Sequence, residues 1–296
     1  MHDKKFNILV TGANGQLGRC LRDACRSSRN RFIFTDVSEI PGLETTPLDI
    51  SNRDAVDIVA DSEDVDIIVN CAGYTNVDKA EEETFMADIL NNVAAGNLAA
   101  TARRRGALLI HISTDYIFSG SANTPIREDA APAPLGVYGA TKLAGENAIL
   151  SSACRSIIIR TAWMFSEYGR NFVKTMLALT EGHPSIRVVC DQVGTPTYAH
   201  DLARFIVDII DGGKTGLTGI YNFTNEGVCS WFDFATAINS LSSHSCKVNP
   251  CRSEDYPSKA RRPHYSVLDK SKVKSVFGVE ISHWTDALER CMKKLK

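Results

Sequence analysis

The first half of the chain alternates short apolar runs with longer stretches of helical periodicity. The apolar runs predict strands at residues 6–11, 31–36, 66–70, 108–113 and 156–160. Most of these runs are too apolar to leave one face of a sheet in water. Strands that alternate with helices in this way form a parallel sheet covered by helices on both faces. The pattern therefore predicts an α/β fold on a doubly wound parallel sheet.

The regular alternation ends after Arg160. Apolar positions recur at helical spacing in residues 171–181 and 199–210, and residues 187–190 predict a strand. The polar stretch 240–245 predicts a loop. We therefore expect the C-terminal half to build a smaller region that interleaves with the sheet.

Composition and charge exclude several classes of protein. The 296 residues are 44% hydrophobic, which is enough for a large core, and their formal net charge of -2 favours neither nucleic acid nor an anionic membrane as a partner. Three arginines at 103–105, followed by Gly106, are typical of a helix C-terminus rather than of a nucleic-acid patch. No apolar run is long enough to span a membrane. We expect a small-molecule partner.

The cysteines predict free thiols. The chain has nine, without a C-x-x-C pair, which favours a cytoplasmic protein without disulfides. Cys20 and Cys25 have four residues between them and lie in a predicted helix that carries no histidine pair. Because the spacings of structural zinc ligands are absent, we expect no metal site.

A glycine-rich turn follows the first predicted strand and leads into a helix. Glycines allow a tight turn and let backbone N–H groups approach a diphosphate at the helix N-terminus. The second strand ends at Asp36, at the spacing where a carboxylate meets the ribose of a dinucleotide. No Gly-Lys-Ser/Thr follows, so a phosphoryl-transfer loop is not supported. The turn residues that we expect at the cofactor are Gly12, Asn14, Gly15, Gln16, Leu17 and Gly18.

Two acidic residues near this turn have alternative interpretations. Asp36 is also an ordinary residue for the end of a strand. Asp49 is a candidate to contact the adenine amino group, but the sequence equally allows it to be the N-cap of a helix that begins near Asn52.

Tyr138 and Lys142 form a second constellation, at the start of a predicted helix. Residues four apart share a helical face, and a nearby ammonium favours the phenolate and lowers the pKa of a tyrosine. The alternative is a solvated helix face. The fourth predicted strand ends in Ser113, Thr114 and Asp115, which brings hydroxyls to the edge of the sheet where ligands of α/β folds bind. Together these parts predict an NAD(P)H-dependent carbonyl reductase.

These features resemble the extended branch of the short-chain dehydrogenase/reductase superfamily, and within it the dTDP-4-dehydrorhamnose reductase family. The resemblance rests on residues 70–81, 113–118, 138–146, 160–163 and 191–197, in family order. It implies a Rossmann-type sheet with a smaller, interleaved C-terminal substrate domain. It also implies catalytic roles for Thr114, Tyr138 and Lys142, cofactor contacts by Ala72, Gly73, Tyr138 and Lys142, and substrate contacts by Thr75, Val77, Thr114, Asp115 and Trp163. Packing in the core is the alternative for Val77 and Trp163, and fixing the turn is the alternative for Asp115.

The resemblance implies a dinucleotide-binding domain at residues 1–165, to which residues 188–225 return. Residues 166–187 and 226–296 are then the substrate-binding region. The implied reaction is reduction of the C4 ketone of dTDP-4-dehydro-L-rhamnose to dTDP-L-rhamnose by NADPH or NADH, in the biosynthesis of cell-surface polysaccharide. The alternatives are another extended-family enzyme, such as a sugar-nucleotide epimerase or ketoreductase, or a non-catalytic subunit like the regulatory subunit of methionine adenosyltransferase.

The resemblance leaves the oligomer open, as a monomer or a homodimer. Some relatives have a glutamate two residues after the last glycine of the turn, which serves in metal-bridged dimers. This chain has Cys20 there.

Overall fold

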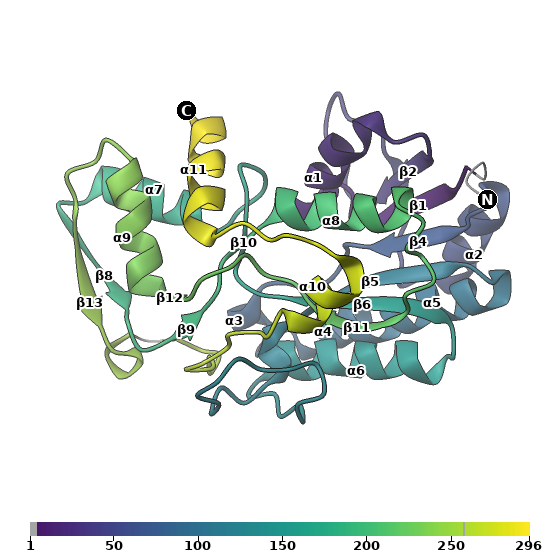
Figure 1. The fold of residues 1–296 in the computed structure, drawn as a ribbon. Helices are drawn as coiled ribbons and strands as arrows, with labels where there is room; N and C mark the ends of the chain where they lie inside the picture. Colours follow the sequence, from purple (N-terminus) through teal and green to yellow (C-terminus); the bar gives the residue numbers. More distant parts are fainter. Residues whose placement is uncertain (1–4, 257) are drawn as a thin grey trace.

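The computed structural model describes residues 5–256 and 258–296. Its centre is a seven-stranded parallel sheet in the order β11-β6-β5-β4-β1-β2-β3 (Figure 1). The strands are β1 (Asn7–Thr11), β2 (Arg31–Asp36), β3 (Thr46–Pro47), β4 (Ile67–Asn70), β5 (Leu108–Thr114), β6 (Arg155–Thr161) and β11 (Gly219–Asn222). All five predicted strands are confirmed, and the doubly wound Rossmann-type fold is confirmed with them.

Helices cover both faces of this sheet. One face packs against α1 (Gln16–Ala24), α8 (Ala199–Asp211) and α10 (Ser271–Phe277). The other packs against α2 (Arg53–Ser62), α5 (Ala94–Arg105) and α6 (Val137–Ser151). Because water reaches neither face, the central strands are apolar on both sides, which explains why their sequences do not alternate.

A smaller lobe lies beyond the carboxyl ends of the strands, on the left in Figure 1. Its core is formed by α7 (Phe172–Gly182), α9 (Trp231–Leu241) and α11 (Trp284–Leu295). The paired strands of this part of the chain are β8 (Ser185–Val189) with β13 (Lys247–Cys251), β7 (Met164–Phe165) with β10 (Thr197–Tyr198), and β9 (Val193–Gly194) with β12 (Cys229–Ser230). Both α8 and β11 come from the segment that we expected to return to the sheet.

Three local predictions need correction. The predicted loop 240–245 begins later, because α9 continues to Leu241 and the Ser240 hydroxyl donates to the Thr236 carbonyl 2.9 Å away. The strand predicted at 187–190 lies at Ser185–Val189. Cys25 lies outside α1, in the short helical turn η1 (Cys25–Ser27) that follows. All nine cysteines are free.

The arginines at the end of α5 have structural partners. Gly106 caps the helix with a φ of 69°, in the left-handed region that glycine favours. Arg104 forms ion pairs with Asp57 and Asp61 of α2, and Arg105 pairs with Asp61 and with Asp64. In the described part of the chain, no helix is long and apolar enough to cross a membrane.

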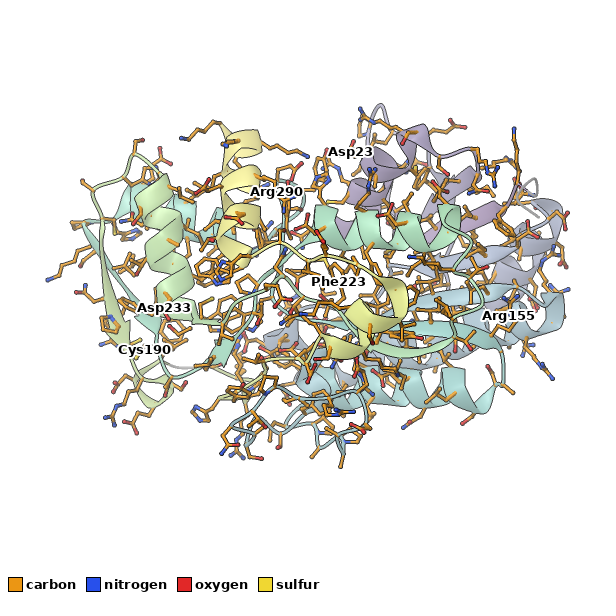
Figure 2. All side chains as sticks on the ribbon, in the orientation of Figure 1. Asp23, Arg155, Cys190, Phe223, Asp233 and Arg290 are labelled. Atoms are coloured by element: carbon orange, nitrogen blue, oxygen red, sulfur yellow. The ribbon has the colours of Figure 1, made fainter. Side chains whose placement is uncertain are left out.

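The strand order predicts a ligand-binding crevice between β1 and β4. The chain builds the sheet outward from β1 in both directions, so the strand order reverses at this point, and ligands of such sheets bind outside the carboxyl ends of the strands there. Figure 2 shows Arg155, where β6 begins, at the end of the sheet far from the smaller lobe. The carboxyl ends therefore face that lobe. The remaining short elements are α3 (Val77–Ala80), α4 (Thr84–Asp88), η2 (Ile89–Val93), η3 (Asp115–Ile117) and η4 (Ser253–Asp255).

Candidate active site

The glycine turn after β1 has the geometry of a diphosphate site. Gly12 has a φ of 65°, and a Cβ at this position would lie 2.5 Å from the Ala72 nitrogen, so only glycine fits. Gly15 is the N-cap of α1 and provides no side-chain cap. The first-turn N–H groups of α1, together with the positive end of its dipole, are therefore arranged to bind an anion.

Asp36 lies directly beside this turn. Its Oδ2 accepts a hydrogen bond from the Asn14 backbone N–H at 3.0 Å, and its Oδ1 accepts from the backbone and hydroxyl of Ser38 at 2.9 and 2.7 Å. The Asn14 side chain donates to the Ser38 carbonyl at 2.6 Å. Asp36 thus connects the end of β2 with the glycine turn, where the ribose of a bound dinucleotide is expected.

The other residues predicted around the turn differ in their surroundings. Gln16 joins the smaller lobe, donating to the Met164 carbonyl at 3.3 Å and accepting from Asn171 at 2.8 Å. Leu17 is buried in the core, and Gly18 lies in the first turn of α1. Asp49 is exposed and accepts from Ser51.

The N-cap interpretation of Asp49 is wrong. Asn52 itself caps α2, accepting from the Ala55 N–H at 3.1 Å, because it is the residue directly before the first helical position.

Thr114 and Tyr138 converge at the carboxyl edge of the sheet. Thr114 is the last residue of β5, Tyr138 lies in the first turn of α6, and the threonine hydroxyl is within hydrogen-bonding reach of the phenol. The Thr114 Oγ1 also accepts from the Tyr116 N–H at 3.2 Å and donates to the Asp115 carboxylate at 3.1 Å. The ring of Tyr116 meets the Tyr138 ring edge-on, with 5.5 Å between centroids. These contacts fix the position of the phenol.

Lys142 lies one turn further along α6 and is buried. Its Nζ donates to the Ile112 carbonyl at 2.6 Å and lies 3.4 Å from the Nε2 of His111. Burial lowers the pKa of Lys142 to about 8, although the Glu146 carboxylate acts in the opposite direction.

The expected lowering of the tyrosine pKa by Lys142 is wrong for this arrangement. Burial raises the pKa of Tyr138 to about 12, and the charge of Asp115 adds to the rise, while the Thr114 hydroxyl opposes it. Because the lysine ammonium points to the Ile112 carbonyl, desolvation of the phenol dominates. The phenol keeps its proton throughout the neutral range, as a proton donor must.

Asp115 is fully buried beside this pair. Burial raises the pKa of its carboxyl to about 6, against the effect of the nearby Ser266 and Thr114 hydroxyls. Among the described residues, its Oδ2 has no hydrogen-bond partner. The carboxyl thus lies buried beside the proton donor, with the hydroxyls of Thr114 and Ser266 as its polar neighbours.

The remaining predicted residues differ in their burial and contacts. The Ala72 N–H donates to Asn70 at 3.1 Å, and a Cβ on Gly73 would lie 4.0 Å from the Lys142 Nζ. Thr75 is exposed and Val77 is partly buried at the start of α3. Trp163 stacks on Trp231 with 3.6 Å between ring centroids, and it packs against the core of the smaller lobe. One face of the Trp163 ring therefore has a structural partner.

Three further side chains support the site and were missed. The Glu81 carboxylate accepts from the Val137 N–H at the start of α6, and the Asn91 amide binds Tyr74 and Thr141 from a π-helical turn. Buried Glu146 pairs with Arg160 at 2.7 Å. Glu81 and Glu146 are the last residues of two segments that carry the family resemblance, whereas Asn91 is marked in the sequence as a polar residue near an apolar run.

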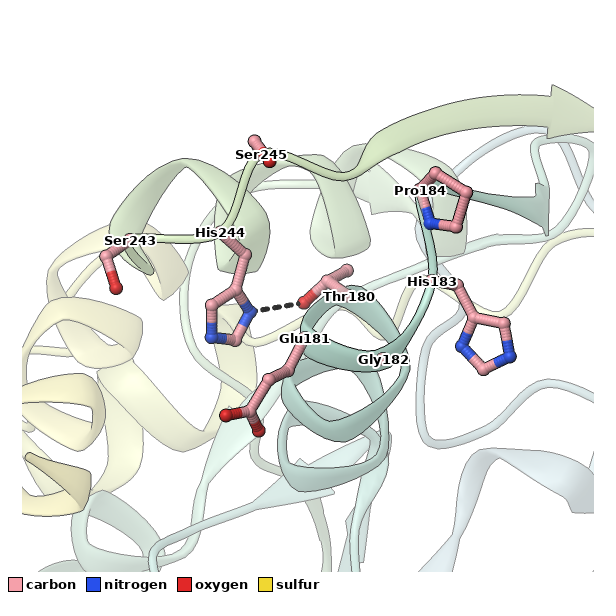
Figure 3. Close-up of a pocket in the computed structure, with 8 residues that line it drawn as sticks. All are labelled: Thr180, Glu181, Gly182, His183, Pro184, Ser243, His244 and Ser245. Atoms are coloured by element: carbon pink, nitrogen blue, oxygen red, sulfur yellow. Dashed lines mark hydrogen bonds between the residues drawn. The ribbon is translucent and has the colours of Figure 1, made fainter.

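Two other groups contain none of the predicted site residues. A pocket of about 330 Å³ lies in the smaller lobe, where the Nδ1 of His244 is 2.8 Å from the Thr180 hydroxyl. Figure 3 shows the residues that line it. None of the predicted site residues lines it. Asp23, Glu167 and His200 bring ligand atoms within 4.8 Å of one another, a cluster that sequence analysis missed. The Lys294 ammonium, 2.9 Å from the Glu167 carboxylate, already supplies a positive charge there.

Comparison with known proteins identifies the family of this chain. The family model of the RmlD substrate binding domain matches residues 6–296. A dTDP-4-dehydrorhamnose reductase from Aggregatibacter actinomycetemcomitans is 40% identical over 291 residues, which cover 95% of this chain and 97% of the relative. The crystal structure of a dTDP-4-dehydrorhamnose reductase from Clostridium acetobutylicum has 40% identity and a TM-score of 0.91, and the match covers 98% of this chain and 99% of the other.

A dTDP-4-dehydrorhamnose reductase from Bacillus anthracis, solved in complex with NADP, is also similar. It has 36% identity and a TM-score of 0.89, and the match covers 98% of this chain and 100% of the other. The chain therefore belongs to the RmlD substrate binding domain family, together with the dTDP-4-dehydrorhamnose reductases.

Proposed function

We propose that this protein uses NADPH or NADH to reduce the C4 ketone of dTDP-4-dehydro-L-rhamnose to dTDP-L-rhamnose, in the biosynthesis of cell-surface polysaccharide. The observation that supports this best is the convergence of Thr114, Tyr138 and Lys142 beside the crevice between β1 and β4. A sheet edge with an anion-binding helix start and a protonated phenol suits carbonyl reduction.

The glycine turn and the residues after β4 fit a dinucleotide. The uncapped start of α1 would hold the diphosphate, Asp36 the adenosine ribose, and Lys142 the nicotinamide ribose, with Asp49 near the adenine and Ala72 and Gly73 lining the crevice. The bound cofactor supplies the hydride.

Side chains of the protein would bind the ketone oxygen and supply the proton. Tyr138 would donate a hydrogen bond to the ketone oxygen, and Thr114 would do so once its hydroxyl turns from the Asp115 carboxylate. Both bonds stabilise the negative charge that develops on that oxygen. Tyr138 then transfers its proton to the alkoxide. Because burial keeps the phenol protonated through neutral pH, it is ready for this step.

The sugar would lie between the sheet edge and the smaller lobe. Val77 and Trp163 offer apolar surface to the C5 methyl group, and Thr75 and Asp115 offer polar contacts. Of the arginines in the C-terminal part, Arg262 pairs with Asp78 on α3 at 2.6 Å, beside Val77, whereas Arg187 donates to the Asp255 carbonyl. We propose Arg262 as the cation nearest the sugar diphosphate.

Domain roles follow from the same geometry. Residues 1–165, with 188–225, would bind the cofactor, and residues 166–187 and 226–296 would bind the substrate. Cys20, which stands where some relatives have a metal-binding glutamate, is fully buried. We therefore propose a monomer, or a homodimer that no metal bridges at this residue, and the nine free thiols fit a cytoplasmic protein.

A panel of nucleotide-linked 4-keto sugars separates the candidate functions. Incubation with NADPH should consume cofactor fastest with dTDP-4-dehydro-L-rhamnose. Faster turnover of another sugar would assign a different ketoreductase, and isomerisation without net cofactor loss would assign an epimerase. Tight NADPH binding without turnover of any sugar, together with co-purification of a larger enzyme, would indicate a regulatory subunit.

A further inference from the structure

A buried polar chain connects the glycine-turn strand with the catalytic helix. The Thr11 hydroxyl at the end of β1 donates to the Asn70 Oδ1 at 2.7 Å, and the Asn70 amide contacts the His111 Nδ1 at 3.0 Å. The His111 Nε2 in turn lies 3.4 Å from the Lys142 Nζ. Thr11, Asn70, His111 and Lys142 are all buried. A histidine in the middle of an otherwise apolar strand costs free energy unless its polar atoms are used.

The register of the sheet explains why these residues meet. His111 on β5 is directly opposite Asn70 on β4. His111 and Ser113 are two positions apart on β5, so they point to the same face, where they meet Lys142 and Glu146 of α6, four positions apart. Two residues on one face of β5, His111 and Ser113, therefore each meet a residue on one face of α6, Lys142 and Glu146 respectively.

The contacts determine which imidazole nitrogen carries the proton. The Asn70 Oδ1 accepts from both the Thr11 hydroxyl and the Ala72 backbone N–H, so its amide nitrogen must be the donor toward His111. The His111 Nδ1 is therefore an acceptor, and the Nε2 of the neutral ring carries the hydrogen. Burial lowers the pKa of His111 well below its ordinary value, which keeps the ring neutral.

This tautomer affects the lysine. An amine at the Lys142 Nζ accepts from the His111 Nε2–H and donates to the Ile112 carbonyl, so both contacts are satisfied. An ammonium has no lone pair and faces the same N–H with a hydrogen of its own. The Glu146 carboxylate of α6 raises the pKa of Lys142, but it also binds Arg160 and Ser113. Tyr138, on the same helix, is uncharged.

We propose that His111 is a positioning residue for Lys142. His111 holds the lysine nitrogen at the Ile112 carbonyl and makes the Lys142 ammonium lose its third proton more readily. The inference rests on the proposed role of Lys142 in cofactor binding. It makes the affinity for NADPH depend on pH near the working range, because only the ammonium attracts the electron-rich ribose oxygens and phosphates strongly.

The tautomer is tested first on the unaltered protein. Nitrogen NMR of histidine-labelled protein, with the His111 signals assigned by their loss in His111→Gln, should show a protonated Nε2 and a bare Nδ1 from pH 6 to 9. A protonated Nδ1, or a ring that titrates in this range, would overturn the proposal.

Cofactor binding tests the effect on the lysine. The dissociation constant of NADPH, followed by tryptophan fluorescence, should rise with pH above a break near the pKa of Lys142. In His111→Phe the break should move up by about half a pH unit or more, a roughly threefold change in proton affinity. His111→Gln, which retains a donor, should keep the break near its original position. Ile110→Val, on the opposite face of β5, is the control for a general loss of packing and should not move it.

Two results separate the failure of this proposal from the failure of the proposed function. If Lys142→Met binds NADPH as tightly as the unaltered protein at every pH, Lys142 has no role at the cofactor, and the proposed function loses that residue. If Lys142→Met weakens binding and the break stays fixed in His111→Phe, only the role of His111 is wrong.

Discussion

The Glu81 carboxylate accepts a hydrogen bond from the backbone N–H of Val137, 2.9 Å away and 56 positions later in the chain. Val137 is the first residue of α6, and its N-cap, Gly136, has no side chain with which to cap the helix. Glu81 therefore serves as a cap from a distant segment, at the positive end of the helix dipole. Tyr138 is the next residue, so this contact also fixes the proposed proton donor.

Replacement of Glu81 tests the distant cap. Glu81→Ala should lower the free energy of unfolding by about 1–2 kcal/mol and reduce kcat on the order of tenfold or more, because Tyr138 is no longer held in place. Glu81→Gln keeps an acceptor and should lose less of both. Urea unfolding and steady-state kinetics measure the two effects.

Glu82→Ala is the matched control for this series. Among the described residues, the neighbouring Glu82 carboxylate pairs only with the exposed Lys259 ammonium, so its loss should change stability by less than about 1 kcal/mol. Equal effects of the Glu81 and Glu82 replacements would show that the cap has no special role.

Gly139 allows α6 to approach η3, the short turn that follows β5. A Cβ at this position would overlap the Tyr116 carbonyl oxygen, so Gly139→Ala should destabilise the protein by roughly 1–3 kcal/mol and reduce turnover by displacing Tyr138. Gly182→Ala, at the end of α7 where a methyl group meets open space, should be neutral or slightly stabilising. Thermal unfolding compares the two, and equal stabilities would refute the close approach.

Asp115 should make stability depend on pH. Its pKa of about 6 lies above that of an unfolded aspartate, so between about pH 4 and 6 the folded protein keeps a proton that the unfolded chain releases. The contribution of Asp115 to the free energy of unfolding is therefore full at low pH and falls by on the order of 2–3 kcal/mol as the pH rises. Asp115→Asn removes this loss. The difference in unfolding free energy, variant minus unaltered protein, should grow from pH 4.5 to pH 7.5, and a constant difference would contradict the buried ionisation.

Asp36 should influence the choice of cofactor. Its carboxylate at the glycine turn repels a 2′-phosphate, so Asp36→Ala should shift the ratio of kcat/KM for NADH and NADPH toward NADPH by about tenfold. Both cofactors should also bind less tightly, because Asn14 loses its acceptor. Asp49→Ala, at an exposed carboxylate near the proposed adenine position, should leave the ratio unchanged. A ratio that Asp36→Ala leaves unaltered would place the ribose elsewhere.

Some features could be predicted from the sequence because they depend on neighbours along the chain. Runs of apolar residues predicted the five central strands, and the glycine turn predicted the start of α1. Tyr138 and Lys142 were recognisable because four positions make one helical turn. The two-residue strand β3 and the edge strand β11 have no such pattern.

Other features depend on tertiary contacts that no local pattern records. Glu81 caps α6 only because α3 and α6 pack together, and His111 meets Asn70 only through the register of β4 and β5. The sequence predicted a lowered pKa for Tyr138 from the nearby Lys142. Burial reversed that direction, since the strength of desolvation is set by the fold.

The most direct test of the proposed reaction follows a hydride into the product. Incubation of the protein with dTDP-4-dehydro-L-rhamnose and NADPH deuterated at the transferred position should yield dTDP-L-rhamnose with deuterium at C4, detected by NMR. Tyr138→Phe should still bind the cofactor but form this product about 10²-fold or more slowly. Deuterium that stays in the cofactor, or a Tyr138→Phe variant with unchanged turnover, would contradict the account.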